Sequence, residues 1–361
     1  MKEFLEFKVN LDTFIEDLQT RLQANEKKVD ELLAQEEKTY ANFVKPLQMM
    51  DEYLGQFFTP LSHINSVSNT GETQKVYSDS LPIITEYSTK ISQNLDIYKA
   101  YKEIEAKEKE SLNFTQNRVL ELNIQHFELS GAHLDDATKA RLQEINIKKS
   151  ELSNKFSQNL LDATNAYEYI ITDAKDVEGL PESDISTAKF DDNGEVKYKF
   201  TLQMPSYIAY MTYGKNPQIR ETLYKAYVTR CPENAAIIDE ILALKNEMSQ
   251  LLGFNNYAEY SLAGKMAESE DAVLGFLEDL IKNSKAQAKV ELAEVQAIAP
   301  NTLQSFDTAF YSEILKKEKY DIDEEEYRPY FEQTSVINGT FTFLSSLFGI
   351  RFEKLNEALW D

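Results

Sequence analysis

IIDEILALKNEMSQLLGFNNYAEYSLAGKM, residues Ile237–Met266, is the most informative part of this sequence. Apolar residues recur in its first half at three- and four-residue spacing, which predicts a helix with one buried face. These residues are Ile237, Ile241, Leu244, Met248, Leu251 and Leu252. Gly253 follows them, and glycine favours the left-handed backbone conformation at a helix C-terminus. Asn255 and Asn256 can then cap a second helix. The stretch therefore predicts a core helix, a turn and a short second helix.

The composition outside this stretch is also typical of a helical protein. The chain has 361 residues, of which 42% are hydrophobic, and contains only 11 Gly and 9 Pro. A chain of this length suggests about two domains with a sizeable core. Because the apolar residues mostly recur at about 3.6-residue spacing, we expect a mainly α-helical protein with few strands.

The net charge of −23 and the single cysteine restrict the expected partners and compartment. An acidic surface repels phosphates and anionic lipids, so we expect neither nucleic acid nor membrane as a partner. It could favour cationic peptides, although simple solubility explains the charge as well. Cys231 has no partner for an internal disulfide and is predicted to be an inert thiol in a reducing compartment. The sequence shows no signal-peptide pattern at Met1–Glu6 and no membrane-spanning run, so a cytoplasmic location is expected.

Helical spacing extends over most of the remaining chain. It predicts helices near Phe14–Leu33, Tyr40–Phe58, Thr73–Gln93, Asp96–Lys109, Phe114–Phe127, Leu142–Tyr169, Leu274–Val295 and Phe341–Leu347. Phe57–Val67, which contains Pro60, is predicted to begin with a turn. Asp191–Gly194 is a turn signal, and Glu195–Leu202 alternates as a half-buried strand does.

The three histidines form no recognisable metal site. A zinc hydrolase usually needs three protein ligands, a position for water and a nearby carboxylate, and H-E-x-x-H on a helix supplies most of these. That motif is absent from the 361 residues. His63 has no potential ligand at metal spacing, and a glycine separates His126 from His133. We predict all three to be packed or exposed, and we assign no catalytic, cofactor-binding or metal-ligating residue.

Other candidate sites are equally weak. Neither G-x-S-x-G nor a phosphate-binding glycine motif occurs. The acidic run Asp321–Glu326 lacks the spacing and glycine of a calcium loop, so an acidic helix start is the preferred interpretation. The tyrosines of Tyr207–Tyr227 could line a peptide-binding wall, but core packing with the hydroxyl at the rim is the more common role of such residues.

Six segments, in order along the chain, resemble the thimet oligopeptidase / oligopeptidase A family of zinc metallopeptidases. They are FFTPLSHINSV, LPIITEYST, LYKAYVTR, LLGFNNYA, AFYSE and YRPYF. The resemblance implies an almost wholly helical, two-lobed fold around a deep channel that admits short peptides, which zinc-activated water hydrolyses. It also implies that the chain is roughly the amino-terminal half of such an enzyme. Its end at Trp360-Asp361 precedes the zinc ligands, so the isolated chain is expected to be inactive.

The resemblance also implies a division of the chain and a set of partners. Residues 1–120 would form a first helical lobe, 121–300 a second with a strand near 195–203, and 301–361 a return to the first lobe. Channel walls would draw on Tyr207–Tyr227 and Phe306–Tyr330, although Phe306 stands where the family often has Trp. Expected partners are short peptides and the missing carboxy-terminal catalytic half. The alternative is a non-catalytic peptide-binding module, or one half of a split two-chain peptidase.

Overall fold

The computed structural model describes residues 7–322 and 326–354, and these residues form two compact units. Unit 1 contains residues 7–156 and 235–273, and unit 2 contains the other described residues. Helices dominate both units, which confirms the predicted mainly α-helical fold. The division into residues 1–120, 121–300 and 301–361 stays a prediction.

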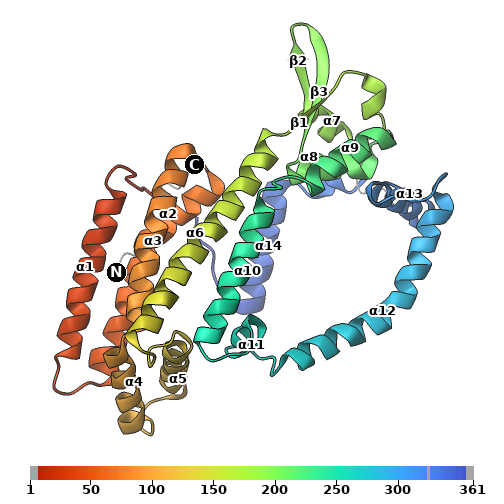
Figure 1. The fold of residues 1–361 in the computed structure, drawn as a ribbon. Helices are drawn as coiled ribbons and strands as arrows, with labels where there is room; N and C mark the ends of the chain where they lie inside the picture. The colour runs from red at the N-terminus through yellow and green to blue at the C-terminus, as the bar shows by residue number, and fades with distance from the viewer. Residues whose placement is uncertain (1–6, 323–325, 355–361) are drawn as a thin grey trace. The chain divides into compact units, whose positions relative to one another are not determined.

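Unit 1 is built from helices that contact their neighbours in sequence (Figure 1). Helix α1 contacts α2 and α3, α2 contacts α3, and α4 packs on α5. Buried Phe14, Leu18 and Leu61 form one core cluster, and Phe43, Ile104 and Leu120 belong to another. The bounds are α1 Phe14–Leu33, a π-helical turn Tyr40–Val44, α2 Lys45–Val67, α3 Gly71–Ser92, α4 Leu95–Glu108, α5 Phe114–Leu129, α6 Asp136–Ala166, α10 Asn234–Leu251 and α11 Tyr257–Leu262.

The core helix predicted from the opening stretch is α10, and the turn after it has the predicted chemistry. Met248 is buried against Leu142 and Ile145 of α6. Gly253 has a φ of +85°, a conformation that L side chains rarely adopt. The Asn256 side chain accepts a hydrogen bond from the Glu259 amide at 2.9 Å and so caps α11.

The predicted turn at the start of Phe57–Val67 is wrong, because α2 continues through this segment to Val67. Proline inside a helix removes a backbone hydrogen bond and costs about 3 kcal/mol. Here Pro60 and Leu61 are buried, and the ring of Phe57 stacks on Phe14 of α1 at 4.7 Å. Burial of this apolar face against α1 offsets the cost and keeps the helix continuous.

Unit 2 contains a small antiparallel sheet with helices around it (Figure 1). The strand order is β1-β3-β2, and α7 and α8 both contact β3. The strands are β1 Glu168–Ile171, β2 Lys189–Asp192 and β3 Glu195–Thr201. The helices are a 3-10 turn Ala174–Val177, α7 Glu182–Ala188, α8 Met204–Tyr213, α9 Pro217–Val228, α12 Glu270–Ile298, a 3-10 turn Ser305–Asp307, α13 Thr308–Tyr320, a 3-10 turn Arg328–Tyr330 and α14 Gln333–Phe348. Helix α12 begins in unit 1, and the residues of α6 from Ser157 on belong to unit 2.

The sheet confirms one prediction and corrects another. The predicted strand is β3, and it pairs with β2 across a turn in which Asn193 and Gly194 have φ values of 57° and 89°. The helix predicted to continue to Tyr169 instead ends at Ala166, and β1 follows it. Tyr169 and the two isoleucines after it are strong strand formers, and β3 supplies the pairing partner, with Tyr169 opposite Phe200.

Three sequence-based expectations fall on residues outside the described ranges. They are the absence of a signal peptide at residues 1–6, the acidic helix start at residues 323–325, and the chain end at residues 360–361. Among the described helices, none combines the length and the apolar character that crossing a membrane requires.

The helix predicted around Phe341 and Leu347 is α14, and Glu332 caps its N-terminus. Its carboxylate accepts hydrogen bonds from the Thr334 and Ser335 amides at 3.0 and 2.7 Å. These bonds lower the pKa of Glu332 to about 2. The cap is therefore fully present above the pKa of an unfolded glutamate and is lost as the pH falls through about 2. We expect carbon-13 NMR to find this low pKa, and Glu332→Ala to speed amide exchange at Thr334. Unchanged exchange at Thr334 would contradict the cap.

Candidate functional site

The histidines considered as metal ligands lie apart from one another on the elements of unit 1. His63 is on α2, with its ring tilted against Phe7 at 5.1 Å. His126 is on α5, and His133 is exposed in the turn after it. Over residues 7–322 and 326–354, no three or more His, Cys, Asp or Glu side chains are grouped so that they could hold a metal ion. The described residues therefore do not fit the zinc ion that the resemblance implies.

His126 has one notable neighbour, the carboxylate of Asp51. Both residues line a cavity of about 380 Å³ that is otherwise mainly apolar and includes Tyr87 and Tyr101. Burial raises the pKa of Asp51, and the nearby His126 opposes this shift. Burial also raises the pKa of Tyr87 to about 12, so its hydroxyl stays protonated at neutral pH. A carboxylate and one imidazole do not make a three-ligand zinc site.

Cys231 is buried in unit 2 and is poorly suited to nucleophilic chemistry. Its thiol donates a hydrogen bond to the Asn159 carbonyl oxygen at 2.8 Å. Burial raises the pKa of the thiol, and the negative charge of Glu233 acts in the same direction. Since the thiolate is the reactive form, this environment disfavours reaction.

Of the five tyrosines of α8 and α9, one is buried, and Tyr207, Tyr213, Tyr224 and Tyr227 are partly exposed. Tyr210 is fully buried, and its hydroxyl donates to the Asp176 carbonyl oxygen at 2.8 Å, so its role is structural. Tyr207 and Tyr227 are partly exposed, and their rings stack at a centroid distance of 4.3 Å. The Arg230 guanidinium lies 3.7 Å from the Tyr227 centroid.

A buried ion pair fixes the segment after α12 to α9 within unit 2. Arg220 is 1% exposed, and its Nη2 donates to Asp307 Oδ1 at 2.6 Å while Nη1 donates to the Gly214 carbonyl oxygen at 2.6 Å. The guanidinium also lies 4.2 Å from the Phe310 ring centroid. The pair thereby positions Phe306, which packs near Tyr224. Phe306 packs against the same hydrophobic cluster as Tyr207, Tyr210 and Tyr224, and the shared channel wall stays a prediction.

Sequence reasoning did not find the Arg220–Asp307 pair. The two partners lie 87 residues apart in the sequence, on α9 and in the 3-10 turn Ser305–Asp307. Neither residue has a local motif that marks it as buried. The available signal was the position of Asp307 directly beside an aromatic residue, which does not identify the partner.

Helices α12 and α14 expose large apolar side chains along much of their length. On α14 these are Val336, Ile337, Phe341, Phe343, Leu347 and Phe348, with Phe343 64% exposed. On α12 they include Leu274, Phe276, Leu277, Leu280 and Ile281. Soluble proteins rarely leave so many neighbouring apolar residues uncovered unless another surface binds them.

Two family profiles match the sequence, one in its first half and one in its second half. "Neurolysin/Thimet oligopeptidase, N-terminal domain" matches residues 11–139, and "Peptidase family M3" matches residues 210–360. Oligopeptidase A of Escherichia coli is 39% identical over 339 residues, covering 89% of this chain and 50% of the relative.

The chain is similar to peptidase family M3 over residues 210–360. It spans about half the length of the curated relatives that it matches. It is 36% identical to the organellar oligopeptidase A of Arabidopsis thaliana and covers 44% of that protein. Saccharolysin of Saccharomyces cerevisiae is 27% identical over 354 residues, covering 92% of this chain and 49% of the relative.

The fold of this chain is shared with a solved structure. A protein of Bacillus anthracis that is provisionally assigned as an oligoendopeptidase F matches with a TM-score of 0.52 at 17% identity, over 86% of this chain and 49% of that one. At this identity the match supports the fold alone. The match to the family M3 profile includes the stacked tyrosine pair only in part, because it begins at Tyr210.

Proposed function

We propose that this chain is the amino-terminal part of an oligopeptidase A-like zinc metallopeptidase that hydrolyses short peptides. The observation that carries the proposal is the 39% identity to E. coli oligopeptidase A along 89% of the chain, which nevertheless covers only half of that protein. The zinc ligands would lie in the part of the protein that this sequence does not cover. The described residues offer no site for the ion, so no catalytic step is assigned to them.

The proposed contribution of this chain is to bind and orient the peptide. Tyr207 has one ring face that Tyr227 does not cover, and its hydroxyl can donate to a peptide carbonyl group, whereas the Tyr227 hydroxyl donates to Met204 Sδ at 3.3 Å. Burial raises the pKa of Tyr207, so its hydroxyl stays a neutral donor at physiological pH. The Arg220–Asp307 pair holds Phe306 against the same cluster and keeps this wall rigid. A rigid wall lowers the entropic cost of ordering a flexible peptide.

The exposed faces of α12 and α14 are the proposed contact surface for the carboxy-terminal catalytic half. Their apolar side chains are numerous and lie at helical spacing. Covering them would remove a large apolar area from water, which is the main favourable contribution to association.

The test is hydrolysis of a quenched fluorescent oligopeptide in the presence of zinc. The 361-residue chain alone is expected to be inactive, and activity is expected after mixing with the carboxy-terminal half of E. coli oligopeptidase A. That half alone is the blank. Phe343→Glu on α14 should impair the complementation, whereas Phe114→Glu, which changes an exposed phenylalanine of α5, should not.

Two results would contradict the proposal. Zinc-dependent hydrolysis by the 361-residue chain alone would mean that its own residues hold the metal. Full complementation by the Phe343→Glu variant would remove α14 from the contact surface. If the mixture is inactive although the chain binds the peptide, the non-catalytic peptide-binding module is the better description.

A further inference from the structure

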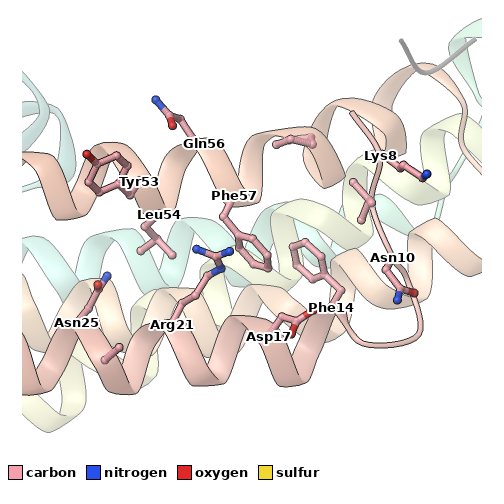
Figure 2. A pocket seen from close by; sticks show the side chains of 13 residues that line it. Lys8, Asn10, Phe14, Asp17, Arg21, Asn25, Tyr53, Leu54, Gln56 and Phe57 are labelled. Atoms are coloured by element: carbon pink, nitrogen blue, oxygen red, sulfur yellow. The ribbon is translucent and has the colours of Figure 1, made fainter. Parts of the chain in front are cut away.

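A groove between α1 and α2 in unit 1 has the size and lining of a ligand site (Figure 2). Its volume is about 670 Å³, within the range of about 300–1,000 Å³ typical of small-molecule pockets. Residues 8–10 close one end, and Asn25 and Tyr53 lie at the other. The groove shares no residue with the tyrosine wall of unit 2, and its proposed role does not depend on peptidase activity.

The centre of the groove combines an aromatic surface with a cation. Phe14 and Phe57 stack at a centroid distance of 4.7 Å with 11° between the ring planes. The Arg21 guanidinium lies 4.4 Å from the Phe57 centroid, and in Figure 2 it reaches from α1 across to the ring. Stacking on an aromatic ring orients the guanidinium plane and leaves its N–H edges available for hydrogen bonds.

The positive charge of Arg21 has no carboxylate partner among the described residues. Arg118, Arg141 and Arg220 each form an ion pair with a glutamate or aspartate. The one carboxylate that lines the groove, Asp17, instead accepts a hydrogen bond from the Thr13 hydroxyl at 2.8 Å.

A second cation, Lys8, lines the end of the groove and forms no ion pair within the described residues either. The chain has 61 acidic and 38 basic residues, but the groove lining holds two cations, Arg21 and Lys8, and one carboxylate, that of Asp17. The lining therefore carries a local excess of positive charge beside an apolar surface.

We propose that this groove binds a carboxylate carried on an aromatic or branched apolar group, such as the C-terminal residue of a short peptide. The Arg21 guanidinium would bind the carboxylate through two parallel N–H···O bonds. The apolar group would lie against the partly exposed Phe57 and against Tyr53, which lines the groove and is 47% exposed, and Lys8 would add attraction at the groove end. An acidic side chain next to an aromatic residue within a peptide could also supply the carboxylate and the apolar group. Separate probes distinguish this side-chain carboxylate from a C-terminal one.

Calorimetric titration of the full 361-residue chain with N-acetylphenylalanine and with its amide tests the proposal. The two compounds differ only in the carboxylate, so the acid is expected to bind and the amide to bind about tenfold more weakly or not at all. A third probe, N-acetyl-glutamyl-phenylalaninamide, carries its carboxylate on a side chain. Binding of this peptide as tight as that of the acid would identify the acidic side chain as an equivalent ligand.

Variants at Arg21 test whether the acid binds in this groove. Arg21→Gln should lower the affinity for the acid about tenfold, and Arg21→Lys should lower it less, because lysine keeps the charge but lacks the planar fork. Arg118→Gln, which removes an exposed arginine of α5, is the matched control and should leave the affinity unchanged. Circular dichroism checks that each variant is folded.

Three outcomes would overturn the proposal. They are no saturable binding of the acid by the parent chain, equal binding of acid and amide, and an affinity in Arg21→Gln equal to that in Arg118→Gln.

Discussion

Replacing Asp307 with alanine is expected to destabilise the folded chain by about 3–5 kcal/mol, because Arg220 would remain buried without its counter-charge. The guanidinium is almost wholly inaccessible to solvent, and its 2.6 Å bond to Asp307 is its one ion pair in the described structure. Its remaining polar contact is with the Gly214 carbonyl oxygen, which carries no charge. Asp307→Asn keeps an acceptor atom but not the charge, so it should lower the free energy of unfolding by less than Asp307→Ala does.

Urea unfolding followed by circular dichroism measures this effect, with Glu221→Ala as the control. Glu221 also forms an ion pair, with Lys225 on the same helix, but both side chains are substantially exposed. Exposed pairs contribute about 0–1 kcal/mol. If Asp307→Ala proves no more destabilising than Glu221→Ala, the ion pair is not buried as described.

Replacing Phe200 with alanine is expected to cost about 3–5 kcal/mol through loss of buried surface and formation of a cavity. Phe200 lies on β3, is 1% exposed and meets the ring of Tyr210 edge to face at 4.9 Å. Val196 lies on the same strand but is exposed, so Val196→Ala should change stability by only about 0.5 kcal/mol.

Hydrogen exchange locates the effect of Phe200→Ala in the chain. Because the chain forms two compact units, unfolding need not follow a single two-state transition. Faster exchange is expected for the amides of β3 and α8, while the amides of α1–α3 should exchange as in the parent chain. Equal acceleration in both units would contradict the assignment of Phe200 to the core of unit 2.

Local patterns predicted the parts of the fold that local interactions determine. The spacing of Leu244 and Met248, the glycine after them and the capping asparagine identified α10, the turn and α11. The Asp191–Gly194 turn and the alternation after it identified the β2–β3 hairpin. Each of these signals acts within about one helical turn or across one hairpin.

The features that the sequence did not predict all depend on contacts between residues that are distant in the sequence. Pro60 is tolerated in α2 because α1 covers its apolar neighbours, and the strand character of Glu168–Ile171 depends on pairing with β3, about 30 residues later. The Arg220–Asp307 pair and the groove around Arg21 likewise join residues from separate elements. Sequence spacing alone carries no information about such pairs.

Alkylation of Cys231 can report local opening of the folded chain. As the single thiol, buried and hydrogen-bonded to the Asn159 carbonyl oxygen, it can meet an alkylating reagent only when the end of α6 and the turn after α9 separate. When reclosing is faster than alkylation, the ratio of the labelling rate to the rate for an exposed thiol gives the free energy of that opening. Any cysteine introduced at an exposed position can therefore carry a spectroscopic probe without competition from the native thiol.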